Sequence, residues 1–314
     1  MQKYVIRRVL ATIPVLLLIS LFTFFAIRLL PGDPARAILG PEADMVAVEA
    51  LRDDLGWNKN VVVQYVDWLA DAVTGDFGTS HRSGDSVVSL IGSRIALTVE
   101  LGIMALIIGL VVAIPLGILA GSRPNTPFDY FSTFFAVLGA AIPNFWLAMM
   151  LILVFSVKLQ WLPALGFTAF LDDPIQNLRS LLLPAIAIGV FQAAVIARQT
   201  RAAMVEVLRQ DYVRTAYAKG LSERTVILRH AFRNALIPVV TVMGLQVSRI
   251  VGGAIIIETV FSLPGLGKLI IDSILFRELV TVQAMALLIA ASVAAINLVV
   301  DVAYGYMDPR IRYE

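Results

Sequence analysis

Asp211-Tyr212-Val213-Arg214-Thr215-Ala216-Tyr217-Ala218-Lys219-Gly220 lies within a polar insert, residues 198–233, that separates two apolar stretches of the chain. Basic side chains recur through the insert, with small and apolar residues between them. This pattern is typical of short helices at a membrane surface, one of which ends at Gly220. A loop that only connects two spans needs neither this length nor an alanine-rich helix closed by glycine. We therefore expect the insert to contact a soluble partner.

The composition places the chain in a membrane. Of its 314 residues 59% are hydrophobic and 15% are charged, and the mean hydropathy is +0.83. Soluble proteins carry about a quarter charged residues. The net charge of +2 gives no general reason for nucleic-acid binding. The sequence has no cysteine, which excludes disulfides and thiol catalysis, and its two histidines, His81 and His230, lie far apart and are too few for a histidine-rich metal site.

Six apolar windows are long enough to cross a bilayer, and we predict an all-α, polytopic protein with six transmembrane helices. Pro143-Asn144 is a candidate kink within the third window, and Arg249 interrupts the fifth. The windows are residues 9–27, 101–122, 130–157, 180–197, 234–257 and 279–300.

The charges of the connecting segments predict the orientation. With six spans both termini share a side, and that side, including the insert, has 14 basic against 7 acidic residues. The positive-inside rule therefore places the termini and the insert in the cytoplasm. The first apolar run is too long for a signal peptide, so we expect an uncleaved helix.

These expectations divide the chain into four parts. They are a cytoplasmic N-terminus (1–8), a first span (9–30), a periplasmic loop (31–97) and a core domain (98–314) that contains the cytoplasmic insert. Within the outer loop, residues 44–55 and 61–73 have apolar residues at helical spacing, and Gly75–Gly78 is predicted to turn. Two roles are open for this loop: it covers the helix bundle, or it docks another protein. A single loop can do both.

The sequence argues against an enzyme or a proton-driven carrier. No span holds paired carboxylates at helical spacing, and neither a nucleophile motif nor a glycine-rich phosphate loop is present. Arg249 is the one charge deep in a span, and Glu258 and Asp301 lie near span ends. An intramembrane charge is a functional candidate by default. Two alternatives are kept: a secondary transporter, which the lack of acidic relays counts against, and a membrane scaffold that binds a soluble partner through the insert.

The insert resembles the cytoplasmic coupling loop of ABC importer permeases, in the version found in the dipeptide/oligopeptide permease family. The resemblance rests on Arg214–Gly220 and on the Arg-His-Ala-Phe-Arg-Asn-Ala-Leu-Ile-Pro run at 229–238. The Glu-Ala-Ala of the wider superfamily is replaced here by Arg214-Thr215-Ala216. Further matching segments occur along nearly the whole chain, at residues 4–8, 30–34, 75–80, 260–267, 297–301 and 308–313.

The resemblance implies a bacterial inner-membrane subunit of a binding-protein-dependent importer. Its implied partners are a second, homologous permease, two ATPase subunits, a periplasmic solute-binding protein and the lipid bilayer. ATP would be bound by the partner subunits, and the chain itself would hold no cofactor and no metal. The cargo implied is a peptide or a peptide-like solute such as glutathione, a nickel chelate or an opine. The residues implied to couple to the ATPase are Tyr212, Arg214, Thr215, Ala216, Ala218, Lys219, Gly220 and Leu221.

Two further groups of residues are candidates for contact with cargo or partner. Arg249, Gln246 and Glu258 are candidates for the pathway, and Phe261, Pro264 and Gly265 for a periplasmic turn facing the solute-binding protein. Lipid exposure of Arg249 would cost roughly 3 kcal/mol. Two interpretations of Arg249 follow: a buried pair with another helix or with the second permease, or an arginine lining an aqueous pathway and attracting an anionic group of the cargo.

Overall fold

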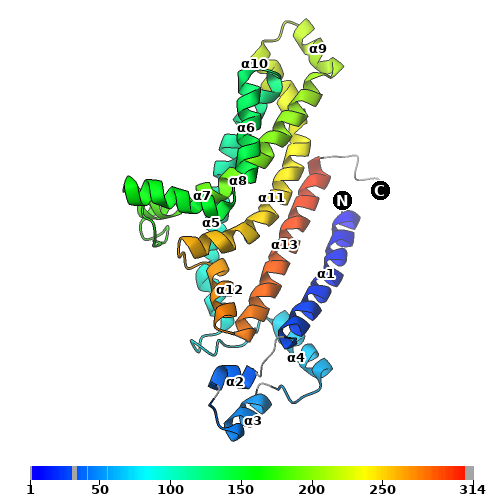
Figure 1. The fold of residues 1–314 in the computed structure, drawn as a ribbon. Coiled ribbons are helices and arrows are strands. Elements are labelled where there is room, and N and C mark those ends of the chain that lie inside the picture. The colour runs from blue at the N-terminus through cyan, green and yellow to red at the C-terminus, as the bar shows by residue number, and fades with distance from the viewer. Residues whose placement is uncertain (1, 30–33, 41, 55, 308–314) are drawn as a thin grey trace. The chain divides into compact units, whose positions relative to one another are not determined.

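The computed structural model describes residues 2–29, 34–40, 42–54 and 56–307, and in this part of the chain the regular structure is helical. The motif at 30–34 lies largely outside the described residues, and the motif at 308–313 lies wholly outside them. The chain divides into two compact units, which we describe separately (Figure 1).

The first unit comprises residues 97–264 and 296–307 of the described chain. Helices α5 and α13 belong to it in part, since each also extends into the second unit. Its helices are α5 (Val87–Ser122), α6 (Pro127–Ala141), α7 (Asn144–Leu151), the π-helix η1 (Ile152–Lys158), α8 (Pro174–Leu208), α9 (Asp211–Ala218), α10 (Glu223–Thr225), the π-helix η2 (Val226–Ala231), α11 (Phe232–Val260) and α13 (Leu279–Met307).

The second unit comprises residues 2–96 and 265–295. Its core is formed by Val87 and Ile91 of α5, Leu269 of the helix after residue 265, and Met285 of α13. Besides parts of α5 and α13 it contains α1 (Gln2–Arg28), α2 (Pro34–Leu39), α3 (Met45–Asp54), α4 (Val61–Thr74) and α12 (Leu266–Leu275).

The span predictions are confirmed. Five helices are long and apolar enough to cross a membrane, at Ile6–Ala26, Val87–Ser122, Pro174–Leu208, Glu223–Val260 and Leu279–Val302. The third predicted window is a bent pair, with Pro127–Ala141 and Asn144–Lys158 meeting at 100°. The break falls at Ile142-Pro143, beside the predicted kink, because proline cannot donate the backbone hydrogen bond that would continue the helix.

Helix α8 is the centre of the first unit. It contacts α11, α6 and α7, and 72% of its apolar window is buried in this chain. Helix α5 packs along it through three glycines. A side chain at Gly117 or Gly121 would overlap Thr200 or Met204 of α8, and one at Gly109 would come within 3.0 Å of Gln192 Cβ. Small residues of this kind let two membrane helices approach closely.

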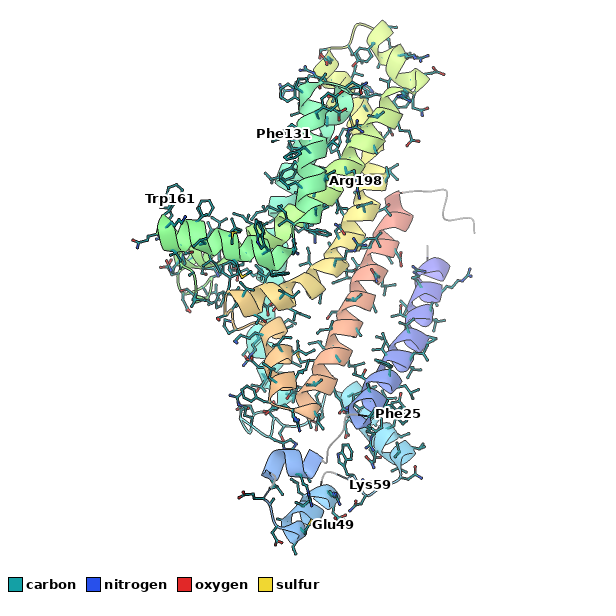
Figure 2. All side chains as sticks on the ribbon, in the orientation of Figure 1. Phe25, Glu49, Lys59, Phe131, Trp161 and Arg198 are labelled. Atoms are coloured by element: carbon teal, nitrogen blue, oxygen red, sulfur yellow. The ribbon has the colours of Figure 1, made fainter. Side chains whose placement is uncertain are left out.

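The apolar surface of the remaining helices is consistent with contact to lipid or another subunit. In Figure 2, Phe131 on α6 and Trp161 after η1 project away from the ribbon, and both are more than half exposed in this chain. The window of α1 is only 17% buried, as is that of α13. An apolar surface of this extent would be unusual on a soluble monomer.

The predicted helices of the outer loop are also confirmed. They are α3 and α4, with Gly56-Trp57 between them. Helix α4 begins at Asn60, whose side chain accepts a hydrogen bond from the Val62 backbone N–H, and ends at Gly75 with φ of 86°. A side chain at the N-cap and a left-handed glycine after the last turn are favoured helix boundaries.

Candidate functional site

Helix α9 is the core of the predicted coupling loop. Its inner face consists of Val213 and Ala216, which are buried and pack with Val226 of η2 and with Leu208 at the end of α8. The Asn234 side chain of α11 donates a 2.8 Å hydrogen bond to the Tyr212 hydroxyl. These contacts attach α9 to the ends of two long helices, so that α9 is not a free surface element (Figure 1).

The outer face of α9 is open. Ala216 is among the residues implied to couple to the ATPase, but it is buried within this chain, so its small size serves packing against Val226. Ala218 remains exposed. The exposed predicted residues are Tyr212, Arg214, Thr215, Ala218, Lys219, Gly220 and Leu221. Arg214 and Asp211 form an exposed ion pair at 3.4 Å.

Gly220 ends this helical segment in a left-handed conformation, with φ of 76°. Its N–H donates to the Tyr217 carbonyl at 2.9 Å, and no atom lies within 4 Å of where a side chain would start. The backbone conformation, and not lack of space, is therefore the reason for glycine at this position.

The pathway candidates Gln246 and Arg249 lie together in the middle of α11. The Arg249 guanidinium donates to Gln246 Oε1 at 3.2 Å. Gln246 is buried and Arg249 is exposed on the surface of this chain. The neighbouring glycines leave room around Arg249. No atom lies within 4 Å of where a Cβ would stand at Gly252. At Gly253 only the Asn144 amide comes close, at 3.9 Å.

Glu258, the third pathway candidate, is fully buried near the end of α11. The Thr98 hydroxyl of α5 donates to Glu258 Oε1 at 2.6 Å. The Glu258 backbone carbonyl accepts from the Leu263 N–H at 2.8 Å, which closes the turn after the helix. Within the first unit, Glu258 therefore ties α5 to the end of α11, and it does not lie with Arg249.

The predicted periplasmic turn joins helices and is only partly open. Phe261 and Leu263 are buried in the core of the first unit, while Pro264 is exposed. Gly265 is buried and begins α12, which belongs to the second unit. Of the three candidate residues, only Pro264 is thus available to a partner from this chain's surface.

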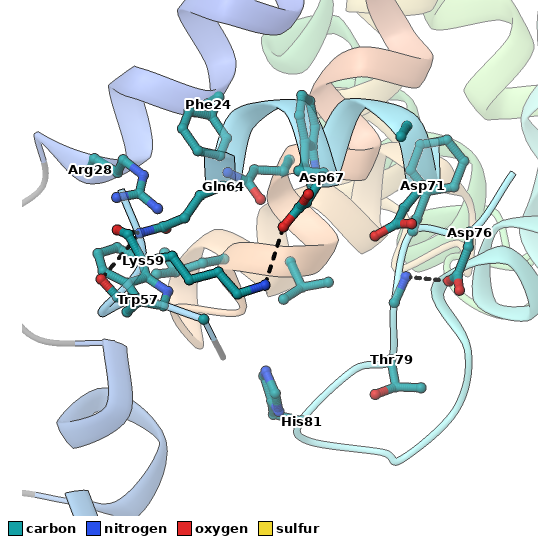
Figure 3. Close-up of a pocket in the computed structure, with 18 of the residues that line it drawn as sticks. Phe24, Arg28, Trp57, Lys59, Gln64, Asp67, Asp71, Asp76, Thr79 and His81 are labelled. Atoms are coloured by element: carbon teal, nitrogen blue, oxygen red, sulfur yellow. Dashed lines mark hydrogen bonds and ion pairs between the residues drawn. The ribbon is translucent and has the colours of Figure 1, made fainter. Parts of the chain in front are cut away.

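The second unit contains a pocket of about 680 Å³ (Figure 3). The Arg28 guanidinium lies 4.6 Å from the centre of the Phe24 ring and 4.4 Å from that of Trp57. Burial lowers the pKa of Arg28, although an arginine keeps its charge in proteins. Asp71 and Asp76 lie on the other side of the pocket in Figure 3, and Lys59 pairs with Asp67 at 3.2 Å. The pocket is therefore dipolar.

Next to this pocket the loop at residues 79–86 is held by one carboxylate. Glu278 accepts hydrogen bonds from the Ser80 hydroxyl at 2.7 Å and from the Arg82 backbone N–H at 2.9 Å. The Arg82 guanidinium lies 3.6 Å from the centre of the Phe276 ring. The predicted turn at 75–78 is present, with Asp76 accepting from the Gly78 N–H.

Comparison with known proteins gives the family. The family described as "Binding-protein-dependent transport system inner membrane component" matches residues 113–313, and its N-terminal counterpart matches residues 1–102. The chain belongs to this family. It is 44% identical to the glutathione transport system permease protein GsiC of Escherichia coli K12 over 314 residues, and 41% identical to the dipeptide transport system permease protein DppB of Alkalihalophilus pseudofirmus over 333 aligned positions. Both alignments cover the whole of both chains.

Solved structures agree on the fold of this permease. A chain of the MetNI methionine ABC transporter in an inward-facing conformation matches 70% of the permease and 96% of its own length, with a TM-score of 0.55 and 18% identity. A chain of an amino acid ABC transporter matches with a TM-score of 0.52 and 14% identity, over 69% of the permease and 93% of that chain. The fold is that of type I ABC importer permeases, as the sequence predicted.

The permease also contains polar residues that sequence reasoning missed. Gln192 of α8 is buried beside Gln246, and Asp129 of α6 is buried against Arg201 of α8. A search for charges alone passes over Gln192, because an amide in an apolar window carries no charge. Asp129 lies just outside the third predicted window, and its structural role depends on Arg201, which is distant in the sequence.

Proposed function

We propose that this permease is the membrane subunit of an ATP-driven importer for peptides or peptide-like solutes, and that α9 is the element through which ATPase partners move it. The observation that carries the proposal is the division of α9 into a buried face, fixed to η2 and α8, and an open face ending at Gly220. The names of the full-length relatives, a dipeptide and a glutathione permease, support the class of cargo.

The coupling follows from how α9 is attached. A partner that grips the exposed face moves the helix as a unit, because Val213 and Ala216 are fixed against Val226. The Tyr212–Asn234 hydrogen bond carries this displacement to the start of α11. Since α11 also carries Gln246 and Arg249, movement at the loop reaches the proposed pathway along one helix. Packed helices of this kind transmit rigid-body shifts.

The proposed orientation places both termini and residues 198–233 in the cytoplasm, where ATP is held by two ATPase subunits. The basic side chains of the loop support this, because such residues are retained on the cytoplasmic side. A second, homologous permease completes the pathway, and a periplasmic solute-binding protein delivers the cargo. The dipolar pocket and the exposed loop at 79–86 are our candidates for its docking surface.

Arg249 is proposed to line the pathway. Its guanidinium donates to the neutral Gln246 side chain, and no carboxylate pairs with it among the residues that the structure describes. It is also exposed on this chain, beside the space left by Gly252. An arginine in this position attracts an anionic group of the cargo as the cargo crosses.

The test is reconstitution of the complete complex in liposomes with the cognate binding protein outside. ATP enclosed in the lumen, on the ATPase side, should drive peptide accumulation, and a non-hydrolysable analogue should not. Uptake driven by a proton gradient without the ATPases would instead identify a secondary transporter. Stable association with a soluble partner but no transport would identify a scaffold.

A further inference from the structure

Two buried side-chain amides in the first unit have hydrogen-bonding atoms without a partner. Gln192 of α8 is 2% exposed and Gln246 of α11 is 1% exposed. Gln192 Oε1, an acceptor, and Gln246 Nε2, a donor, are both buried with no hydrogen bond. Buried polar groups are nearly always paired, so each of these atoms requires an explanation.

The two amides belong to one polar line that reaches the surface of the chain. Gln192 Nε2 donates to the Gln246 backbone carbonyl at 3.5 Å, and Gln246 Oε1 accepts from Arg249 at 3.2 Å. Arg249 lies at the exposed end of this line, where Gly252 leaves its surroundings open. From the surface inward, the line therefore presents the Arg249 cation, the unpaired donor Gln246 Nε2 and the unpaired acceptor Gln192 Oε1.

We propose that this line binds the carboxyl-terminal end of a peptide. Arg249 takes the terminal carboxylate, Gln246 Nε2 donates to the carbonyl of the last peptide group, and Gln192 Oε1 accepts from its N–H. The proposal rests on the function proposed above, and it names the cargo as a solute in which a free carboxylate follows an amide bond. One donor and one acceptor match the acceptor and donor of one peptide group.

The site is closed in this structure, because both unpaired atoms are covered. At 3.5 Å, the bond from Gln192 to the Gln246 carbonyl is at the outer limit for a hydrogen bond and is therefore weak. Helices α8 and α11 also pack closely against each other, so the two unpaired atoms become accessible when the helices shift apart during the transport cycle. Bound cargo then replaces the Gln192–Gln246 bond with bonds to both free atoms, so the peptide end itself favours the open arrangement.

The experiment measures ATP-dependent uptake of three probes by the reconstituted complex: Ala-Ala, Ala-lactate, in which an ester oxygen replaces the peptide N–H, and Ala-Ala-amide, which lacks the carboxylate. Gln192→Met keeps the length of the side chain but removes its acceptor. We expect the wild-type preference for Ala-Ala over Ala-lactate, about tenfold for one hydrogen bond, to disappear in this variant. Gln192→Asn keeps an uncharged amide acceptor on a shorter side chain and should retain part of the preference. Arg249→Gln should abolish the preference for Ala-Ala over Ala-Ala-amide.

Thr200→Val is the matched control, because Thr200 is a buried polar residue of the same helix whose hydroxyl bonds only within α8, to the Ile196 carbonyl. It should leave both preferences unchanged. If Gln192→Met slows all three probes equally, Gln192 only links α8 to α11 and the inference is wrong, while ATP-driven uptake by the wild type still supports the proposed function. Equal wild-type uptake of the three probes would overturn the inference directly. Absence of any ATP-driven uptake would overturn both proposals.

Discussion

At the scale of single residues, the Asp129–Arg201 pair shows how a charge can serve packing in a membrane protein. Both Asp129 oxygens accept from the Arg201 guanidinium, one of them at 2.8 Å, and the Asn125 N–H also donates to this carboxylate. The Asp129 side chain is 3% exposed and that of Arg201 is 33% exposed. The pair fixes the start of α6 to α8, and the bidentate geometry makes it one of the stronger types of ion pair.

Asp129→Asn should therefore lower the stability of the permease. Removing one partner of a buried ion pair lowers the free energy of unfolding by about 3–5 kcal/mol. Because Arg201 is partly exposed, we expect a value at the lower end of this range. Thermal unfolding in detergent measures it. Asp211→Asn is the control, because the Asp211–Arg214 pair is exposed and should contribute nothing measurable. Equal unfolding temperatures for the two variants would contradict the structural role of Asp129.

Gly220→Val should uncouple ATP hydrolysis from transport. A β-branched residue is strongly disfavoured at φ of 76°, so the chain after α9 would adopt another path and Lys219 would leave its place. We expect the complex to assemble and hydrolyse ATP with a several-fold lower ratio of peptide transported to ATP consumed.

Gly166→Val is a matched control for this variant. Gly166 also has a left-handed backbone, with φ of 97°, and no atom lies within 4 Å of where a side chain would start, but it lies in the loop between η1 and α8, outside every site proposed here. The backbone strain is thus similar in the two variants and only its place differs. Normal coupling in Gly220→Val, or equal loss of coupling in both, would remove Gly220 from the coupling mechanism.

At the scale of elements, the sequence predicted which segments are helical but underestimated their length. The second window begins at residue 101, whereas α5 begins at Val87, and the fourth covers 180–197, whereas α8 runs from Pro174 to Leu208. Charge-free windows mark the part of a helix that lies in hydrocarbon. The helical backbone continues beyond this part until it meets a capping signal. For α8 this signal is Asp173-Pro174, where the Asp173 carboxylate accepts hydrogen bonds from two backbone N–H groups.

The bend between α6 and α7 was predictable because proline has a local effect. The π-helices η1 and η2 were not, because neither Ile152–Lys158 nor Val226–Ala231 contains a residue that requires a wider turn. Their geometry depends on packing against other segments. The residues that pack against them come from distant parts of the chain, as Arg201 does for Asp129. The spacing of residues within one segment therefore cannot predict them.

The loop at 79–86 is an element held mainly by one carboxylate, and Glu278→Gln tests this. Glutamine has a single acceptor oxygen, whereas the three hydrogen bonds from Ser80, Arg82 and Thr281 are spread over both oxygens of Glu278. We expect faster amide hydrogen exchange at Arg82, by about tenfold, with little change in α12. Asp272→Asn is the control, since its 3.5 Å pair with Lys268 lies within α12. Unchanged exchange at Arg82 would show that other contacts hold the loop.

At the scale of the whole molecule, the proposed orientation can be tested cleanly because the chain has no cysteine. Cysteines at Asp76 and Pro264, both exposed, should react with a membrane-impermeant thiol reagent from the periplasm, and one at Arg214 only after the membrane is opened. Gly265 is buried and therefore unsuitable as a probe. The reverse pattern of labelling would invert the topology.

The sequence could predict the class of fold and a short helix that ends before Gly220 in the polar insert, because both depend on local composition and on motifs. It could not predict that Ala216 packs inward, nor that Gln192 meets Gln246, because these contacts join α9 to η2 and α8 to α11. Arg249 was identifiable by its charge alone. Its surroundings became clear only when the exposed and buried faces of α11 were known.

The close fit of α5 to α8 has a consequence for biosynthesis. Helix α5 enters the membrane before α8, because the ribosome must still complete residues 123–173 before any of α8 exists. During that interval the face of α5 that carries Gly109, Gly117 and Gly121 lacks its α8 partner, and lipid chains fill the grooves of a bare backbone poorly. A nascent chain in this state is a natural client for an insertase or a membrane chaperone. Substitutions along this face would accordingly appear as degraded protein, before any defect in transport could be measured.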